Sequence, residues 1–208
     1  MRFDQKKILV TGGSRGIGRA IATRFAAAGA RVAIHYGSNH EAADVAIKNL
    51  EGTGHILCSG DVAEPETTQR IVRETVEKLG GLDVLVNNAG IFEAHPVDDV
   101  TFDDWQLAWQ QTLAVNLTGP ANLCWQAIDH MRHNGGGHII NVSSRGAFRG
   151  EPRCPAYGAS KAGLNAMTQS LAQHVAPYGI FVGAVAPGFV ETDMASKVLD
   201  GPDGDAVR

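Results

Sequence analysis

Short apolar runs alternate with longer segments of helical period along this chain, and this alternation restricts the fold more than any other feature. The runs predict strands at residues 7–11, 31–36, 55–59, 83–87, 138–143 and 180–185. The segments between them predict helices at residues 19–28, 41–50, 66–79, 103–116, 121–133 and 157–176. Apolar runs without period-two alternation fit strands buried on both faces. The pattern therefore predicts a doubly wound α/β fold, with helices on both faces of a parallel sheet.

The composition fits one soluble globular domain, which we expect to span residues 1–208. Hydrophobic residues make up 44% and charged residues 19% of the chain, and the formal net charge is −4. This mild charge gives no reason to expect a nucleic-acid or membrane partner. Three widely spaced cysteines form no disulfide or metal-binding pattern, and the first apolar run is too short for a signal peptide. We therefore expect a cytoplasmic protein without a metal site.

A glycine-rich segment, TGGSRGIG at residues 11–18, lies between the first expected strand and the first expected helix. Glycines there allow a tight turn and let backbone N–H groups approach a pyrophosphate at the helix N-terminus. The spacing is G-x-x-x-G-x-G, which differs from the common G-x-G-x-x-G fingerprint. The segment predicts a dinucleotide-binding loop, and a glycine-rich turn without a ligand is the alternative.

The end of the second expected strand favours NADP(H) over NAD(H). NAD-binding proteins usually carry an acid about 20 residues past the loop, where it bonds the ribose. Here no acid precedes Glu41, so nothing repels a 2′-phosphate. Arg15 can supply a cation, and Ser38 and Asn39 can donate hydrogen bonds. We expect NADP(H) as the preferred cofactor, with NAD(H) as the alternative.

Tyr157 and Lys161 are four residues apart and so share one face of a predicted helix. A phenol can donate a proton to a carbonyl oxygen, but its pKa of about 10 is far from neutral. Lowering that pKa by about three units takes roughly 4 kcal/mol, which one nearby ammonium can supply. Ser144 ends the fifth expected strand and could hold the substrate oxygen. A surface pair of tyrosine and lysine is the alternative for this motif alone.

Several further motifs occur in a fixed order with these two. They are Asp61-Val62, NNAG at 87–90, Asn116, Ser143-Ser144, and Pro187-Gly188 followed by Thr192. Together the motifs resemble the short-chain dehydrogenase/reductase family over essentially the whole chain. Their amino-acid sequences are most similar to those of the 3-oxoacyl-[acyl-carrier-protein] reductase-like members. The resemblance implies a single Rossmann-type domain and an oxidoreductase.

The resemblance also implies roles for four catalytic residues. Tyr157 would be the general acid/base, and Lys161 would lower its pKa and bind the nicotinamide ribose. Ser144 would orient the substrate oxygen, and Asn116 would hold a water that links Lys161 to bulk solvent. Asn87 would instead be structural and tie neighbouring strands together.

The expected cofactor-binding set combines the glycine loop, the end of the second strand and the family motifs. Asp61 and Val62 would contact the adenine, and Val190 and Thr192 the carboxamide end. With Tyr157 and Lys161, the set comprises Gly12, Ser14, Arg15, Gly16, Ile17, Gly18, Ser38, Asn39, Asp61, Val62, Asn88, Ala89, Gly90, Pro187, Gly188, Val190 and Thr192.

The C-terminal region departs from the family, whose members usually continue with another helix and a last strand. We expect the sheet to lack that strand, which leaves residues 180–185 as an apolar edge; the sequence leaves open a truncated chain or a shortened natural member. An apolar stripe of Leu164, Met167, Leu171 and Val175 predicts pairing through the long helices. This would give a homodimer, or a tetramer if the chain were full length.

The sequence as a whole predicts an NADP(H)-dependent oxidoreductase that interconverts a ketone and a secondary alcohol. The substrate would be a small-molecule carbonyl or alcohol, with an acyl thioester among the candidates. The alternative is a non-catalytic NADP(H)-binding protein of the same fold, inactive through loss of the C-terminal segment. Fold and family leave the substrate itself open.

Overall fold

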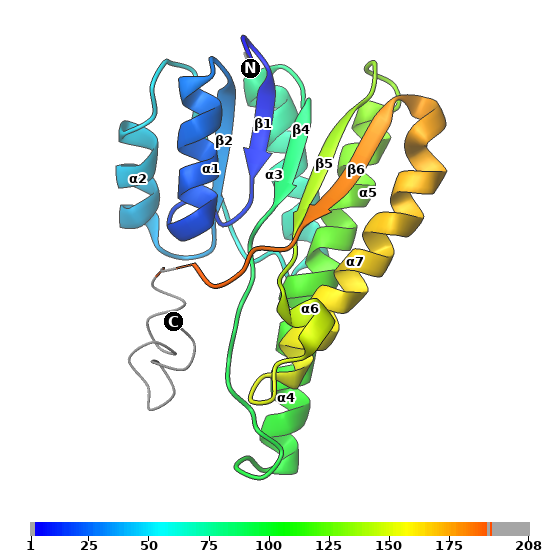
Figure 1. Ribbon diagram of the computed structural model, residues 1–208. Helices are drawn as coiled ribbons and strands as arrows, with labels where there is room; N and C mark the ends of the chain where they lie inside the picture. The colour runs from blue at the N-terminus through cyan, green and yellow to red at the C-terminus, as the bar shows by residue number, and fades with distance from the viewer. Residues whose placement is uncertain (1–2, 191, 193–208) are drawn as a thin grey trace.

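The computed structural model describes residues 3–190 and 192, which form one parallel six-stranded sheet (Figure 1). The strands are β1 (Lys7–Val10), β2 (Arg31–Tyr36), β3 (Ile56–Ser59), β4 (Val84–Asn87), β5 (Gly137–Val142) and β6 (Ile180–Val185). They lie in the order β3-β2-β1-β4-β5-β6, which confirms the predicted doubly wound fold. The strand order reverses between β1 and β4. Ligands of such sheets bind outside the carboxyl ends of the strands at that reversal.

Helices cover both faces of the sheet, because successive residues of each buried strand point to opposite sides. Ile8 and Val10 of β1 pack in the core under α1 (Gly16–Ala27) and α2 (His40–Lys48). Leu9 packs in the opposite core, under three further helices. Those helices are α3 (Pro65–Leu79), α5 (Gly119–Met131) and α7 (Pro155–Val175). Two separate apolar cores therefore hold the sheet between them.

The two helices expected at 103–116 and 121–133 are joined in the structure. α4 (Phe102–Leu113) continues through a π-helical turn, Ala114–Thr118, directly into α5. Pro120 lies in the first turn of α5, where its missing N–H is tolerated. The π turn adds a residue to the helix and carries Asn116, which is fully buried. Such turns inside helices are frequently found at functional sites.

The apolar stripe on α7 faces the chain's own core, so it lends no support to the predicted dimer, which stays a prediction. Leu164 and Val175 are about 1% exposed, and Met167 and Leu171 pack against the buried core. These side chains cover β5 and β6, which lie beside α7 in Figure 1. The expectations for residues 193–208 fall outside the described part of the chain.

Two short elements complete the described residues. α6 (Gly146–Arg149) follows β5, and a 3₁₀ turn, Ala176–Tyr178, follows α7; neither was predicted. β6 lies at one edge of the sheet, with Phe181 64% exposed. Over the part of the chain that is described, no helix has the length and apolar character needed to cross a membrane.

Candidate active site

A cleft of about 840 Å³ opens at the carboxyl ends of the strands, at the reversal between β1 and β4. Its size falls within the roughly 300–1,000 Å³ of small-molecule and cofactor sites. The predicted residues that line it are Gly12, Ser14, Arg15, Gly16, Ile17, Ser38, Asn39, Asp61, Val62, Asn88, Ala89, Gly90, Ser144, Tyr157, Lys161, Pro187, Gly188 and Thr192. Three predicted residues lie outside the lining: Gly18, Asn116 and Val190. Seven further lining residues were not among the predicted site residues, although Ser143 belongs to a motif: His35, Gly37, Gly60, Ile91, Val115, Val142 and Ser143.

The glycine loop forms a cradle that side chains would fill. Gly12 and Gly16 have φ angles of +61° and +52°, a backbone region that favours glycine. A Cβ on Gly18 would lie 2.2 Å from the Gly12 carbonyl oxygen and 2.5 Å from the Asn88 amide nitrogen. Gly18 therefore acts from behind the cleft wall, by letting α1 approach the loop. The cradle lies at the start of α1, where backbone N–H groups and the helix dipole favour a phosphate.

Thr11 and Asn88 hold this loop against the end of β4. The Thr11 hydroxyl accepts hydrogen bonds from the backbone N–H groups of Asn88 and Ala89, at 2.9 and 3.0 Å. The Asn88 amide donates to the carbonyl oxygens of Thr11 and Gly12, at 2.9 and 3.2 Å. Asn88 thus shapes the loop through its side chain in addition to lining the cleft.

The end of the cleft next to β2 carries polar and cationic groups. Arg15 and Ser38 are exposed there, and Asn39 caps α2 by accepting from Ala42 N at 2.9 Å. Asp61 is the one acidic residue of the lining within the described residues, and its carboxylate accepts from Ala63 N at 2.9 Å. This end can accommodate a ribose phosphate without a carboxylate on β2 to repel it.

At the opposite end, α7 and the end of β5 bring the predicted catalytic side chains together. The Lys161 ammonium donates to the Val142 carbonyl oxygen at 2.8 Å and lies 5.7 Å from the centre of the Tyr157 ring. Ser144 is in hydrogen-bonding contact with the Tyr157 phenol. Phe92 packs its ring edge-on against Tyr157, with centroids 4.7 Å apart. A hydroxyl, a phenol and an amine therefore meet on one wall of the cleft.

Electrostatics in this structure differ from the expectation that Lys161 lowers the pKa of Tyr157. Burial raises the pKa of the phenol, although its hydrogen bond with Ser144 works in the other direction. Burial also lowers the pKa of Lys161 to about 8, because desolvation penalises its charged form. In the chain without a cofactor, the ammonium donates its hydrogen bond to the Val142 carbonyl oxygen and makes none to the phenol. The phenol is protonated at neutral pH and can donate a proton.

The Asn116 side chain makes three hydrogen bonds within the chain, and its expected role of holding a water stays a prediction. Its amide accepts from Ile91 N at 2.8 Å and donates to Ile91 O and the Ser160 hydroxyl, at 3.0 and 3.2 Å. The Ser160 hydroxyl in turn donates to the Tyr157 carbonyl oxygen at 2.7 Å. Asn116 therefore ties the segment after β4 to the helix that carries Tyr157 and Lys161.

Asn87 has the structural role that was predicted for it. Its amide donates to Asn141 on β5 at 2.9 Å, which joins two neighbouring strands.

Across residues 3–190 and 192, no group of three or more histidine, cysteine, aspartate or glutamate side chains could hold a metal ion.

Comparison with known proteins agrees with this arrangement. A family described as "short chain dehydrogenase" matches residues 6–203. An "Uncharacterized oxidoreductase" of Thermotoga maritima is 40% identical over 206 residues, which are 98% of this chain and 79% of the relative. The 3-oxoacyl-[acyl-carrier-protein] reductase FabG of Staphylococcus aureus is 37% identical, over 94% of this chain and 78% of the relative. A short chain dehydrogenase from Burkholderia cenocepacia, crystallised in complex with NADP, is 42% identical with a TM-score of 0.88 and covers 99% of this chain, which spans 82% of that one.

Proposed function

The chain belongs to the short-chain dehydrogenase/reductase family, and we propose that it is an NADP(H)-dependent enzyme that interconverts a ketone and a secondary alcohol. The observation that carries the proposal is the single cleft that joins the glycine loop to Ser144, Tyr157 and Lys161. The alternative of a non-catalytic binding protein gains no support, since these three side chains line that cleft.

Ser144, Tyr157 and Lys161 would each have one role in the reaction. A bound nicotinamide would supply or take up the hydride. The Ser144 hydroxyl would hold the substrate oxygen beside the Tyr157 phenol. Tyr157 would donate its proton to that oxygen during reduction and take it back during oxidation, the role of a general acid/base. Lys161 would hold the nicotinamide ribose and favour the phenolate left on Tyr157.

The cofactor preference rests on Arg15, Ser38 and Asn39 at the open end of the cleft. The Burkholderia relative in complex with NADP supports this preference. A guanidinium and hydrogen-bond donors favour a 2′-phosphate. NADP(H) is therefore the proposed cofactor, and NAD(H) is the weaker one.

A small-molecule carbonyl or alcohol is the proposed substrate. The relatives named 3-oxoacyl-[acyl-carrier-protein] reductase make an acyl thioester with a 3-oxo group the first compound to try. A homodimer remains a prediction, which light scattering coupled to size exclusion would test. A cytoplasmic location is likewise proposed.

The test is a panel of ketones, 3-oxoacyl thioesters and secondary alcohols, followed at the absorbance band of NADPH. We expect oxidation of NADPH with at least one carbonyl compound. The same preparation carrying Tyr157→Phe serves as the control for contaminating reductases. Turnover that is unchanged in this variant would remove the proposed mechanism.

A further inference from the structure

His35 on β2 connects two walls of the cleft through one buried ring. The side chain is 2% exposed, and its residue lines the cleft beside the glycine loop. Its Nδ1 accepts a hydrogen bond from Gly12 N at 3.3 Å, and its Nε2 lies 2.9 Å from the Gly60 carbonyl oxygen. Because a backbone N–H can only donate and a carbonyl can only accept, both bonds form together only in the neutral ring with its proton on Nε2.

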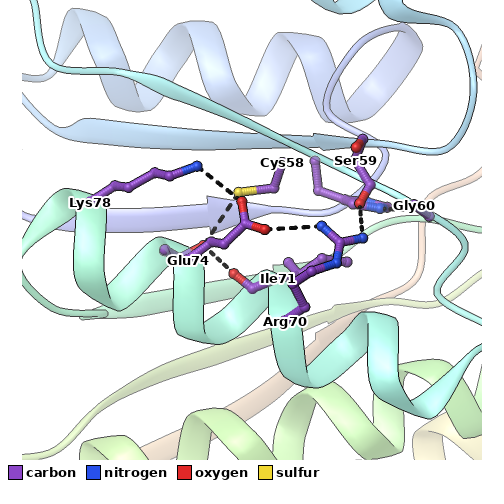
Figure 2. Close-up of polar contacts among 9 residues, drawn as sticks. Cys58, Ser59, Gly60, Arg70, Ile71, Glu74 and Lys78 are labelled. Atoms are coloured by element: carbon purple, nitrogen blue, oxygen red, sulfur yellow. Dashed lines mark hydrogen bonds and ion pairs between the residues drawn. The ribbon is translucent and has the colours of Figure 1, made fainter.

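The turn after β3 is held from its other side by α3. Figure 2 shows Arg70 reaching to the Ser59 carbonyl oxygen, a distance of 2.8 Å, while Glu74 bonds the same guanidinium at 3.0 Å. Gly60 has a φ of +128°, and a Cβ there would lie 2.6 Å from Thr67 and 2.8 Å from the Arg70 guanidinium. This turn leads into Asp61 and Val62, the expected adenine contacts. The turn is therefore fixed between Arg70 outside and His35 inside.

We propose that His35 is a positioning residue for the dinucleotide, whose neutral imidazole sets the spacing between the glycine loop and the β3–α3 turn. The inference rests on the proposed function, because it presumes that a dinucleotide binds across these two walls. It adds a residue outside the cofactor contacts that the motifs indicate. Through its two bonds, the ring fixes the position of Gly12, at the expected phosphate end, relative to Gly60, at the expected adenine end.

Burial favours the neutral form of the His35 ring, and the charges around it partly oppose this effect. Burial lowers the pKa of His35, and the positive charge of Arg70 on α3 acts in the same direction. The Gly60 carbonyl and the negative charge of Asp61 work against this and raise it. The glycine loop itself faces the ring with the main chain of Gly12. Protonation would place an N–H against the Gly12 N–H, so cofactor affinity should fall at acid pH, below the ordinary titration range of histidine.

Three substitutions separate the two bonds. His35→Phe keeps a ring but loses both bonds. His35→Asn places an amide oxygen near the position of Nδ1 and can restore the bond from Gly12 alone. His35→Gln reaches the position of Nε2 and can restore the bond to Gly60 alone.

His55 offers a matched control, because it makes the same kind of bridge away from the cleft. Its Nδ1 accepts from Val32 N at 3.1 Å, and its Nε2 lies 2.9 Å from Glu51 O. His55→Phe therefore loses two bonds of the same kind, at a more exposed position, without touching either cleft wall. Loss of stability alone should appear in both phenylalanine variants.

The experiment is fluorescence titration with NADPH and with adenosine 2′,5′-bisphosphate, which carries only the adenine half. We expect His35→Phe to weaken both ligands about ten- to hundredfold, since each buried group left unpaired is costly. The Asn and Gln variants should fall between it and the wild type, and His55→Phe should bind normally. The acid loss of affinity should be present in the wild type and reduced in His35→Phe.

Unchanged affinity in the Asn, Gln and Phe variants, measured at temperatures where each is folded, would overturn the role of His35. Equal losses in His35→Phe and His55→Phe would overturn it as well, since they would indicate a general effect of stability. If the wild type bound neither NADPH nor NADH, the proposed function itself would fail, and this result is distinct from the other two.

Discussion

The two halves of the cleft differ in the features that give them their shape. The half that follows β1, β2 and β3 is shaped by closely packed glycines, of which Gly18 and Gly60 have no room for a Cβ, and it carries Arg15 and Ser38 at its exposed end. The half that follows β4 and β5 presents side chains, among them Ser144, Tyr157 and Lys161. The first half depends on close approach of main chains. The second depends on hydrogen bonds that orient functional groups, which Asn116 and Val142 supply.

Because of this difference, we expect some substitutions to weaken cofactor binding and others to slow turnover. A substitution in the first half changes either a steric fit or a charge that faces the cofactor, so it should act on the dissociation constant of the cofactor. A substitution that keeps the shape of a side chain in the other half should leave binding intact and act on turnover. The substitutions below each lie in one of the two halves of the cleft.

The largest effect is expected for Tyr157→Phe. The ring and its packing against Phe92 are retained, while the proton donor is lost. Turnover should fall by about 10²–10⁴, the usual scale for general acid/base catalysis. Steady-state kinetics at saturating NADPH measures this, and a loss of less than about twofold would contradict the role of Tyr157.

Gly18→Ala should act on the other half. The new Cβ would overlap the Gly12 carbonyl, so α1 and the glycine loop must separate. Overpacking of this kind costs about 1–3 kcal/mol, which corresponds to roughly ten- to hundredfold weaker NADPH binding. Gly183→Ala is the control, since among the described residues nothing lies within 4 Å of a Cβ there. Equal affinities in the two variants would show that the cradle is not a binding element.

The buried Lys161 predicts a pH dependence of stability that belongs to the chemical half. The unfolded chain keeps this proton up to about pH 10.5, and the folded chain releases it at about 8. Between these values the unfolded state binds more protons, so the free energy of unfolding rises with pH. Urea denaturation should show a rise of about 2 kcal/mol from pH 8 to 9.5, which Lys161→Met should remove. An identical rise in that variant would assign the effect to other groups.

A smaller effect is expected for the choice of cofactor. The wild type should bind NADPH more tightly than NADH, and Arg15→Ala combined with Ser38→Asp should reverse the order. The first change removes a cation, and the second adds an acid that repels the 2′-phosphate. A change of about tenfold for each cofactor is expected in the titrations. Preference of the unaltered chain for NADH would refute the interpretation of Arg15.

The same division explains what could be predicted from the sequence. The sheet and the glycine loop were predictable because strand burial and the turn at Gly12 and Gly16 are local properties. The bridge of His35 and the bonds of Asn116 join residues 25 or so apart in sequence, and no local pattern encodes them. The π turn was missed for a related reason, since it appears only where α4 must continue into α5.

Burial affects two of the sequence-based expectations. The apolar stripe on α7 gave no sign of which face would meet the sheet, and the structure turns Leu164 and Val175 inward. In the chain without a cofactor, desolvation raises the pKa of the Tyr157 phenol and lowers that of Lys161, and the lowering of the phenol's pKa by Lys161 stays a prediction. Burial and direction are properties of the folded chain.

The most direct test of the central claim is to titrate NADPH into the wild type and into Tyr157→Phe under the same conditions. The division of the cleft predicts saturable binding with one site per chain and the same dissociation constant for both proteins, within about twofold. A wild-type chain that does not bind NADPH, or a Phe variant that binds it tenfold more weakly, would contradict the account.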